Sequence, residues 1–257
     1  MAISHGSFVW YELMTTDAAA AEAFYRDVVG WKTRDAGMPG MAYTLLEVAG
    51  APVAGLMTLP AEAAQSGARP GWIGYVAVDD VDAAAKSFAA AGGTIYRAPD
   101  DIPGIGRFAV AADPQGAVIC LFRGSGDMGP PAPPAGTPGT IGWHELMATD
   151  WQPAFDFYAA QFGWTKAEAH DMGPMGLYQL FAKNGETVGG MMTKPAEVPV
   201  AYWGYYFNTE AIDAAAARVT AAGGKILFGP MEVPGGSWVV QGLDPQGAVF
   251  ALVAPKR

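Results

Sequence analysis

Two glutamates in this 257-residue chain have nearly the same neighbours. Glu12 lies in the segment FVWYELM and Glu145 in IGWHELM, and the alternation of each segment predicts a strand. Residues two apart on a strand share a face, so Trp10 accompanies Glu12 and Trp143 accompanies Glu145. A carboxylate in an aromatic, partly dry cleft has a raised pKa and can act as a general base or as a hydrogen-bond acceptor for a ligand. A purely structural carboxylate, bonded to a backbone amide or an arginine, fits the pattern equally well.

The two surroundings match because the chain contains an internal repeat. Residues 8–31 and 141–164 are identical at 11 of 24 positions, AAGG occurs at 90–93 and 221–224, and DPQGAV occurs at 113–118 and 244–249. Such a repeat predicts homologous domains. We expect one domain at 1–123 and another at 140–257, joined by a linker at 124–139 whose prolines and glycines leave little to bury.

Each domain divides again into two similar units. In the first, a strand at 8–14 precedes a helix that Asp17 caps and Gly30 ends, and three short strands follow. The same βαβββ order fits residues 71–123. Because the second domain repeats the sequence of the first, we expect the same order there. We therefore predict an α+β fold of two tandem domains, with βαβββ units at about 7–60, 71–123, 140–195 and 201–254.

The helix that ends in FYxxxxGW (24–31 and 157–164) and the DPQG turn before a final apolar strand resemble the vicinal oxygen chelate superfamily. This family includes glyoxalase I, extradiol dioxygenases and bleomycin resistance proteins. The resemblance implies that paired βαβββ units form a curved, incompletely closed mixed sheet, with helices outside and the ligand in the concave cleft. It does not by itself define a reaction.

The resemblance also locates the positions that carry metal ligands in metal-dependent members. They fall at Trp10, about Gly55, Ile73 and Cys120 in the first domain, and at Trp143, about Gly190, Gly204 and Ala251 in the second. None is a histidine or carboxylate, the donors that a divalent metal would need here. We therefore expect no metal and no cofactor. His144 and Glu145 point to opposite faces of their strand and therefore cannot jointly bind a metal. By the usual spacing of metal ligands, His5, His144 and His170 are each expected to be surface or core residues.

Aromatic, thioether and other side chains at matching strand positions are the candidates for lining the clefts. They are Trp10, Tyr43, Met57, Tyr75, Arg107 and Cys120 in the first domain and Trp143, Tyr178, Met192, Tyr206 and Trp238 in the second. Ordinary core packing is the alternative for each of them. Arg107 can anchor a carboxylate or phosphate or form a surface ion pair, and the second domain has Trp238 in its place, so the clefts are expected to differ. Cys120 is expected to behave as a small hydrophobic residue.

The amino-acid composition limits the classes of partner that the chain is expected to bind. The chain has 25 acidic and 15 basic residues and a formal charge of −10, and no Lys/Arg cluster suits nucleic acid or an anionic membrane. A single cysteine and the absence of a leader-like N-terminus favour the cytoplasm. No stretch is long and apolar enough to span a bilayer. We expect a monomer or a homodimer with a small-molecule ligand.

Three functions remain open from the sequence. The first is binding of a small apolar or aromatic molecule without a metal. The second is a metal-independent enzyme with Glu12 or Glu145 as general base on a carbonyl compound. The third is a metal-dependent lyase or dioxygenase with relocated ligands.

Overall fold

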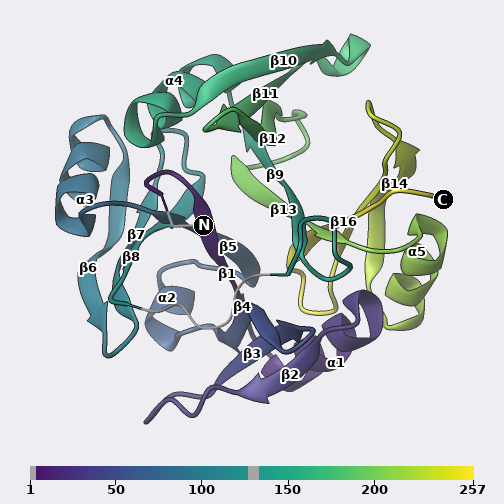
Figure 1. Ribbon diagram of the computed structural model, residues 1–257, viewed down its shortest axis with the longest axis horizontal. Helices are drawn as coiled ribbons and strands as arrows, with labels where there is room; N and C mark the ends of the chain where they lie inside the picture. The colour runs from purple at the N-terminus through teal and green to yellow at the C-terminus, as the bar shows by residue number, and fades with distance from the viewer. Residues whose placement is uncertain (1–3, 127–132) are drawn as a thin grey trace. The chain divides into compact units, whose positions relative to one another are not determined.

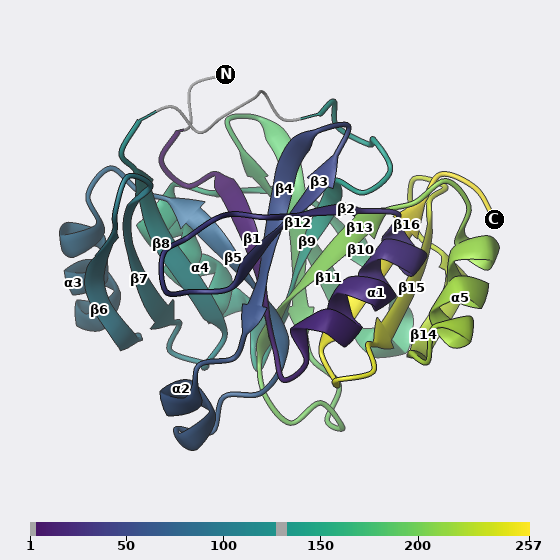
Figure 2. The ribbon, with the colours of Figure 1, turned by 90° about the horizontal axis from the view of Figure 1, so that it is seen from below.

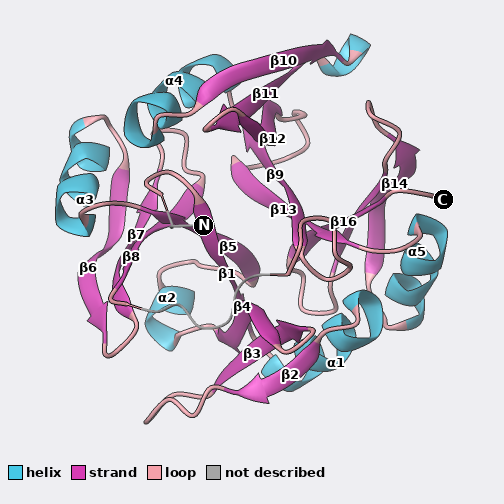
Figure 3. Cartoon of the chain, viewed as in Figure 1, coloured by secondary structure: helices cyan, strands magenta, loops and turns pink. Residues whose placement is uncertain are grey.

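The structure, a computed structural model, describes residues 4–126 and 133–257 (Figures 1 and 3). Residues 127–132 of the predicted linker lie outside the described residues.

The first βαβββ unit begins the chain. It consists of β1 (Phe8–Thr15), α1 (Ala18–Val29), β2 (Lys32–Asp35), β3 (Tyr43–Val48) and β4 (Ala51–Thr58). The Asp17 side chain accepts a hydrogen bond from the Ala20 amide at 3.0 Å and begins α1. Gly30 ends the helix with a φ of 90°, a left-handed conformation that favours glycine. Both ends of α1 were predicted from sequence, and both predictions are confirmed.

The remaining three units repeat this order. After the short helix α2 (Ala61–Gln65), which the sequence pattern did not predict, come β5 (Gly71–Ala77), α3 (Val81–Ala90), β6 (Thr94–Ile102), β7 (Gly106–Ala112) and β8 (Val118–Gly124). The third unit contains β9 (Ile141–Ala148), α4 (Trp151–Phe162), β10 (Thr165–Asp171), a 3-10 turn η1 (Gly173–Met175), β11 (Leu177–Lys183) and β12 (Glu186–Thr193). The fourth contains β13 (Tyr202–Asn208), α5 (Ile212–Ala221), β14 (Lys225–Glu232), β15 (Trp238–Leu243) and β16 (Val249–Ala254).

The strands form two eight-stranded mixed sheets, one for each half of the sequence. Their orders are β2-β3-β4-β1-β5-β8-β7-β6 and β10-β11-β12-β9-β13-β16-β15-β14. Each order has two edges, so neither sheet closes into a barrel. The predicted α+β fold is confirmed. In the parallel pairing of β1 with β4, Glu12 lies opposite Gly55, and in the pairing of β9 with β12, Glu145 lies opposite Gly190.

Residue contacts divide the chain into two compact units that each combine both halves of the sequence. The first unit contains Met1–Val9, Ile73–Met128 and His144–Trp203. The second unit contains Trp10–Trp72, Gly129–Trp143 and Gly204–Arg257. Each compact unit thus takes most of one βαβββ repeat from each half, and each is described by itself below.

In the second unit, α1 and α5 pack on one face of the strands of the fourth repeat. Figure 2 shows α5 beside β14 and β15. Phe24 of α1 contacts Phe250 edge to face, with ring centroids 5.5 Å apart. Side chains alternate along a strand, so Phe250 faces the helices and Ala251 lies on the opposite face. Tyr206, which is paired in register with Ala251, shares that helix-free face.

The two sequence motifs that carry the family resemblance meet at one buried contact in the second unit. Trp72 donates its indole N–H to the Tyr25 hydroxyl at 2.8 Å, and Tyr25 donates to Asp244 at 3.2 Å. Tyr25 belongs to the FY pair of α1, and Asp244 is the first residue of the second DPQG turn. Burial raises the pKa of Asp244. The motifs are therefore partners in packing, although 219 residues separate them.

The first unit contains the corresponding arrangement. Trp203 donates to the Tyr158 hydroxyl at 2.9 Å. Burial raises the pKa of Asp113, the aspartate of the first DPQG turn, and the Tyr158 hydroxyl acts in the opposite direction as a hydrogen-bond donor. The third repeat supplies the tyrosine and the second repeat the aspartate. The same side chains therefore hold sequence-distant repeats together in both units.

Candidate functional site

The predicted residues Trp10, Glu12 and Tyr43 form one hydrogen-bonded chain in the second unit. The Trp10 indole donates to the Tyr43 hydroxyl at 2.9 Å, and that hydroxyl donates to Glu12 Oε2 at 2.9 Å. Glu12 is only 8% exposed. Because β1 places Trp10 and Glu12 on one face, a tyrosine from β3 can bridge them. The arrangement fixes the orientation of a buried carboxylate at the end of a hydrogen-bonded row of two aromatic side chains.

Glycine at position 55 makes this contact possible. A Cβ added to Gly55 would lie 1.9 Å from the Tyr43 hydroxyl oxygen, far inside van der Waals contact. Gly55 lies opposite Glu12 in the β1–β4 pairing, so the ring of Tyr43 passes over β4 to reach the glutamate. Position 55 is one of those that the family resemblance relates to metal ligands. In this chain, the Tyr43 ring from the neighbouring strand β3 occupies the space that a side chain at position 55 would need.

The first unit contains the counterpart from the second half. A Cβ added to Gly190 would lie 2.3 Å from the ring of Tyr178. Glu145 is opposite Gly190 and is 7% exposed, and Met192 is buried farther along β12. Burial, followed by the negative charge of Glu145, raises the pKa of Tyr202 to about 12. The Glu–Gly–Tyr combination is therefore present twice.

The second unit also holds predicted residues from the fourth repeat. Tyr206 forms a buried cluster with Val239 and Ala251, and Trp143 packs against it. The amide of Gln241 donates to the Tyr206 hydroxyl at 2.6 Å. Gln241 was not among the predicted residues, although its place on β15, two residues after Val239, puts it on the face of this cluster. The predicted Trp238 lies instead under the guanidinium of Arg257, 5.1 Å from the ring centroid.

The predicted residues of the second repeat lie in the first unit. Tyr75 is buried, 6.0 Å from Phe122 and 6.4 Å from Phe108 between ring centroids. Cys120 is 1% exposed and is the register partner of Tyr75. Met57, in contrast, is half-buried on β4 of the second unit. Tyr75 and Cys120 contribute a largely apolar wall.

Arg107 is held by two carboxylates in the first unit. It donates to both carboxylate oxygens of Asp82, at 2.7 and 3.0 Å, and to Asp101 at 2.9 Å. These carboxylates raise the pKa of Arg107, first through their hydrogen bonds. Its side chain is 35% exposed. The arginine therefore connects the first turn of α3 to β6.

The histidines lie in different places. His144 is buried, with its ring stacked on Phe8 at 3.9 Å between centroids, and its Nδ1 lies 2.6 Å from the Val188 carbonyl oxygen. Burial lowers the pKa of His144 to about 4. His170 is half-buried on β10. Among residues 4–126 and 133–257, no three His, Cys, Asp or Glu side chains are grouped so that they could hold a metal ion.

Every helix in the described part of the chain falls short of the length and apolar character that crossing a membrane requires.

The arrangement of the candidate site offers three chemical features. Aromatic rings give apolar contact area, buried carboxylates accept hydrogen bonds or protons, and the Gln241–Tyr206 pair adds polar groups at an otherwise apolar surface.

Comparison with known proteins agrees with this fold. The glyoxalase/bleomycin resistance protein/dioxygenase superfamily profile matches residues 7–121 and 140–252. The chain is 34% identical to "Putative glyoxylase CFP32" of Mycobacterium tuberculosis, over 96% of this chain and 94% of that protein. It is 32% identical to "Anthracycline biosynthesis protein DnrV" of Streptomyces peucetius, over 96% and 93%.

A solved structure has a similar fold. The Mn(II)-bound glyoxalase of Novosphingobium aromaticivorans aligns with a TM-score of 0.66 and 20% identity, covering 98% of this chain and 82% of that one. At that identity, the similarity concerns the fold alone. The family profile and the relatives above 30% identity carry the assignment, because they span both halves of the sequence. The chain belongs to the glyoxalase/bleomycin resistance protein/dioxygenase superfamily.

Proposed function

We propose that this protein binds a small planar aromatic molecule at the helix-free face of its sheets, without a metal at the family's usual ligand positions. The observation that carries the proposal is the Tyr43 ring lying over Gly55, repeated by Tyr178 over Gly190. A carboxylate or imidazole at either glycine position would displace the tyrosine. The same rings, with Trp10, present the flat apolar area that suits an aromatic ligand.

The relatives support this ligand class. DnrV and the related DauV of a Streptomyces strain are both named anthracycline biosynthesis proteins, and each is 32% identical over nearly the whole chain. An anthracycline is a planar polycyclic aromatic compound with hydroxyl and carbonyl groups. Such a ligand can stack on aromatic side chains and donate a hydrogen bond to Glu12 or accept one from Gln241.

Three measurements test the proposal together. Elemental analysis of the purified protein is expected to find no stoichiometric metal, and titration with Mn²⁺, Fe²⁺, Ni²⁺, Zn²⁺ and Mg²⁺ is expected to leave the melting temperature unchanged. Calorimetric titration with an anthracycline is expected to show binding that Tyr43→Ala weakens by about tenfold or more, or ~1.4 kcal/mol. Tyr96→Ala is the control, since Tyr96 is 63% exposed and belongs to β6. A stoichiometric metal would contradict the proposal, as would equal binding by both variants.

A second candidate function uses the same carboxylate as a catalyst. Glu12 is buried and hydrogen-bonded to Tyr43, a position in which a carboxylate can take a proton from a bound carbonyl compound. The substitution Glu12→Gln retains an acceptor oxygen for Tyr43 and removes the base. If the protein isomerises the hemithioacetal formed by methylglyoxal and a thiol, we expect Glu12→Gln to abolish turnover while ligand affinity is retained. Unchanged turnover in Glu12→Gln, Glu145→Gln and the double variant would exclude this role.

A further inference from the structure

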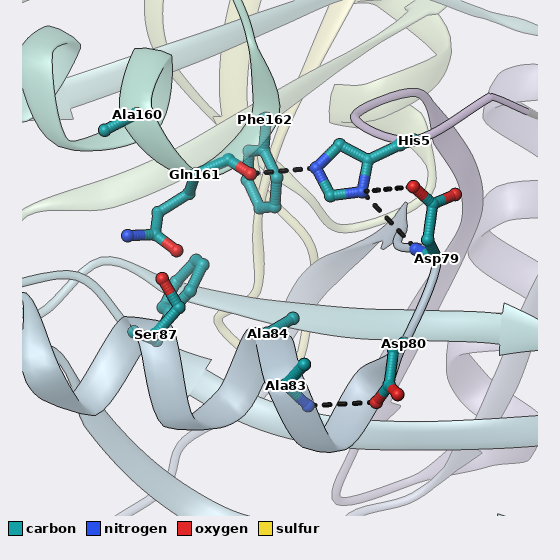
Figure 4. A pocket seen from close by; sticks show the side chains of 10 residues that line it. His5, Asp79, Asp80, Ala83, Ala84, Ser87, Ala160, Gln161 and Phe162 are labelled. Atoms are coloured by element: carbon teal, nitrogen blue, oxygen red, sulfur yellow. Dashed lines mark hydrogen bonds and ion pairs between the residues drawn. The ribbon is translucent and has the colours of Figure 1, made fainter.

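A pocket of about 250 Å³ opens in the first unit, away from the residues discussed above (Figure 4). It lies between α3 and the last turn of α4, with His5 at one end. Its lining residues are His5, Asp79, Asp80, Ala83, Ala84, Ser87, Phe88, Ala160, Gln161 and Phe162. No arginine or lysine is among these described residues.

The internal repeat provides a reference for this pocket. With an offset of 133 residues, α4 corresponds to α1 and Gln161 to Val28. The surroundings correspond as well: Trp164 donates its indole N–H to the Gly6 carbonyl at 2.8 Å, and Trp31 donates to the Gly139 carbonyl at 2.7 Å. With an offset of 131 residues, α3 corresponds to α5, and Ser87 to Arg218. The second unit therefore shows the same helix pair with an arginine in place of Ser87.

In the second unit that arginine binds the end of the helix. Arg218 donates to the Val28 carbonyl from Nε at 3.1 Å and from Nη2 at 2.9 Å. The C-terminal carbonyls of a helix carry partial negative charge and favour cations. In the first unit the Ser87 side chain is too short to repeat this contact. The corresponding Gln161 carbonyl lies 2.9 Å from His5 Nε2, and a carbonyl oxygen can accept a second hydrogen bond.

Two carboxylates at the rim of the pocket also favour a cation. Asp79 and Asp80 lie at its rim, whereas the corresponding residues of the second unit are Glu210 and Ala211. Asp79 Oδ2 lies 3.7 Å from His5 Nδ1, and its side chain is 89% exposed. Asp80 caps α3 by accepting from the Ala83 amide at 2.9 Å. The described lining of this pocket has one more carboxylate than its counterpart and no arginine, while Lys183 donates to the neighbouring Phe162 carbonyl at 3.0 Å and Arg123 donates to the Asp79 carbonyl.

The apolar part of the pocket lining suits a short aliphatic chain of a ligand. Ala83, Ala84 and Phe88 line the α3 side and Ala160 the α4 side. Alanines 214 and 215 occupy the positions of Ala83 and Ala84 beside Arg218. Aliphatic stems of arginine pack on such apolar surface while the guanidinium reaches polar partners.

We propose that this pocket binds a small guanidinium compound with a short aliphatic stem, in the place that Arg218 occupies in the repeat. The guanidinium donates to the Gln161 carbonyl and pairs with Asp79, and the stem lies on the alanines. This site is independent of the aromatic face proposed above, because its residues belong to α3, α4 and the N-terminal segment.

The first test is a titration of the full chain with N-butylguanidine, followed by ¹H–¹⁵N NMR. N-butylurea is the matched control, since it has nearly the same shape without the charge. We expect saturable shifts of the Ser87, Gln161 and Phe162 amides with N-butylguanidine, with a dissociation constant in the millimolar range, and much smaller shifts with N-butylurea. Equal shifts with both compounds, or no saturable shift at these amides, would overturn the proposal.

Four substitutions make the test specific. Ser87→Arg is expected to place the chain's own guanidinium in the pocket. It should weaken N-butylguanidine binding by about tenfold or more and raise the melting temperature. Ser87→Ala, the matched control, is expected to bind N-butylguanidine as the parent does. Arg218→Ser is expected to open the corresponding pocket and add a second group of titrating amides around Val28. If Ser87→Arg does not fold, Asp79→Asn is expected to weaken binding several-fold. Unaltered affinity in the folded Ser87→Arg variant contradicts the proposal, as does unaltered affinity in Asp79→Asn.

Discussion

The buried imidazole of His144 makes the stability of the first unit dependent on pH. Its pKa is about 4 in the folded protein, because burial against Phe8 disfavours the charged ring, and about 6.5 in an unfolded chain. Between these values the unfolded chain binds more protons than the folded one, so stability falls as the pH falls from 6.5 to about 4. Above pH 6.5 the contribution is fully present.

The magnitude follows from the two pKa values. One pKa unit corresponds to ~1.4 kcal/mol, so the complete loss is roughly 3 kcal/mol, with about 2 kcal/mol lost by pH 5. The substitution His144→Asn removes the titration and keeps a donor near the position of Nδ1, which lies 2.6 Å from the Val188 carbonyl. We expect the variant to be less stable at pH 7.5, because it loses the stacking on Phe8. The difference from the parent should shrink by about 2 kcal/mol at pH 5.

Urea unfolding between pH 7.5 and 4.5 measures this difference. Tryptophan fluorescence can follow the unfolding, because two of the chain's eight tryptophans, Trp164 and Trp203, lie 5.7 and 5.6 Å from Phe8 between ring centroids. Comparing parent and variant cancels the carboxyl groups that both contain, including Asp113 and Asp244. A stability difference that stays constant across this pH range would refute the reasoning, as would an NMR titration of His144 with a midpoint near 6.5.

Three further predictions follow from named contacts. Tyr25→Phe leaves the Trp72 indole and the buried Asp244 without their shared partner. We therefore expect the free energy of unfolding, measured in urea, to fall by about 1–3 kcal/mol. An unchanged unfolding midpoint would contradict the contact. Gly55→Ala is expected to destabilise the protein by about 1–3 kcal/mol because its Cβ meets the Tyr43 hydroxyl. In the double variant with Tyr43→Ala the added cost of Gly55→Ala should largely disappear, and strictly additive effects would be inconsistent with this contact. Gln241→Leu removes the donor to Tyr206. Calorimetry should then show weaker binding of aromatic compounds that bear hydroxyl or carbonyl groups, but unchanged binding of plain aromatic hydrocarbons. Equal weakening for both kinds of compound would argue against a polar role of Gln241 in binding.

Much of the fold follows from local patterns that the sequence contains. The repeat, the βαβββ order and the caps at Asp17 and Gly30 were predicted because they depend on residues close in sequence, through period-two alternation and turn chemistry. The same alternation put Trp10 and Glu12 on one face, which is the basis of the candidate site. The short helix α2 was missed, since its five residues bury no side chain and leave no apolar pattern.

Only the tertiary structure decided which distant residues meet. No local rule pairs Tyr25 with Asp244, or brings Tyr43 over Gly55 to reach Glu12, because strand order and packing determine these contacts. Likewise, the sequence shows that Ser87 corresponds to Arg218, but not that the arginine binds the end of α1 and that the serine leaves a pocket. Periodicity reports which face a side chain occupies. The partner on that face depends on long-range packing, which a single sequence does not encode in any local spacing.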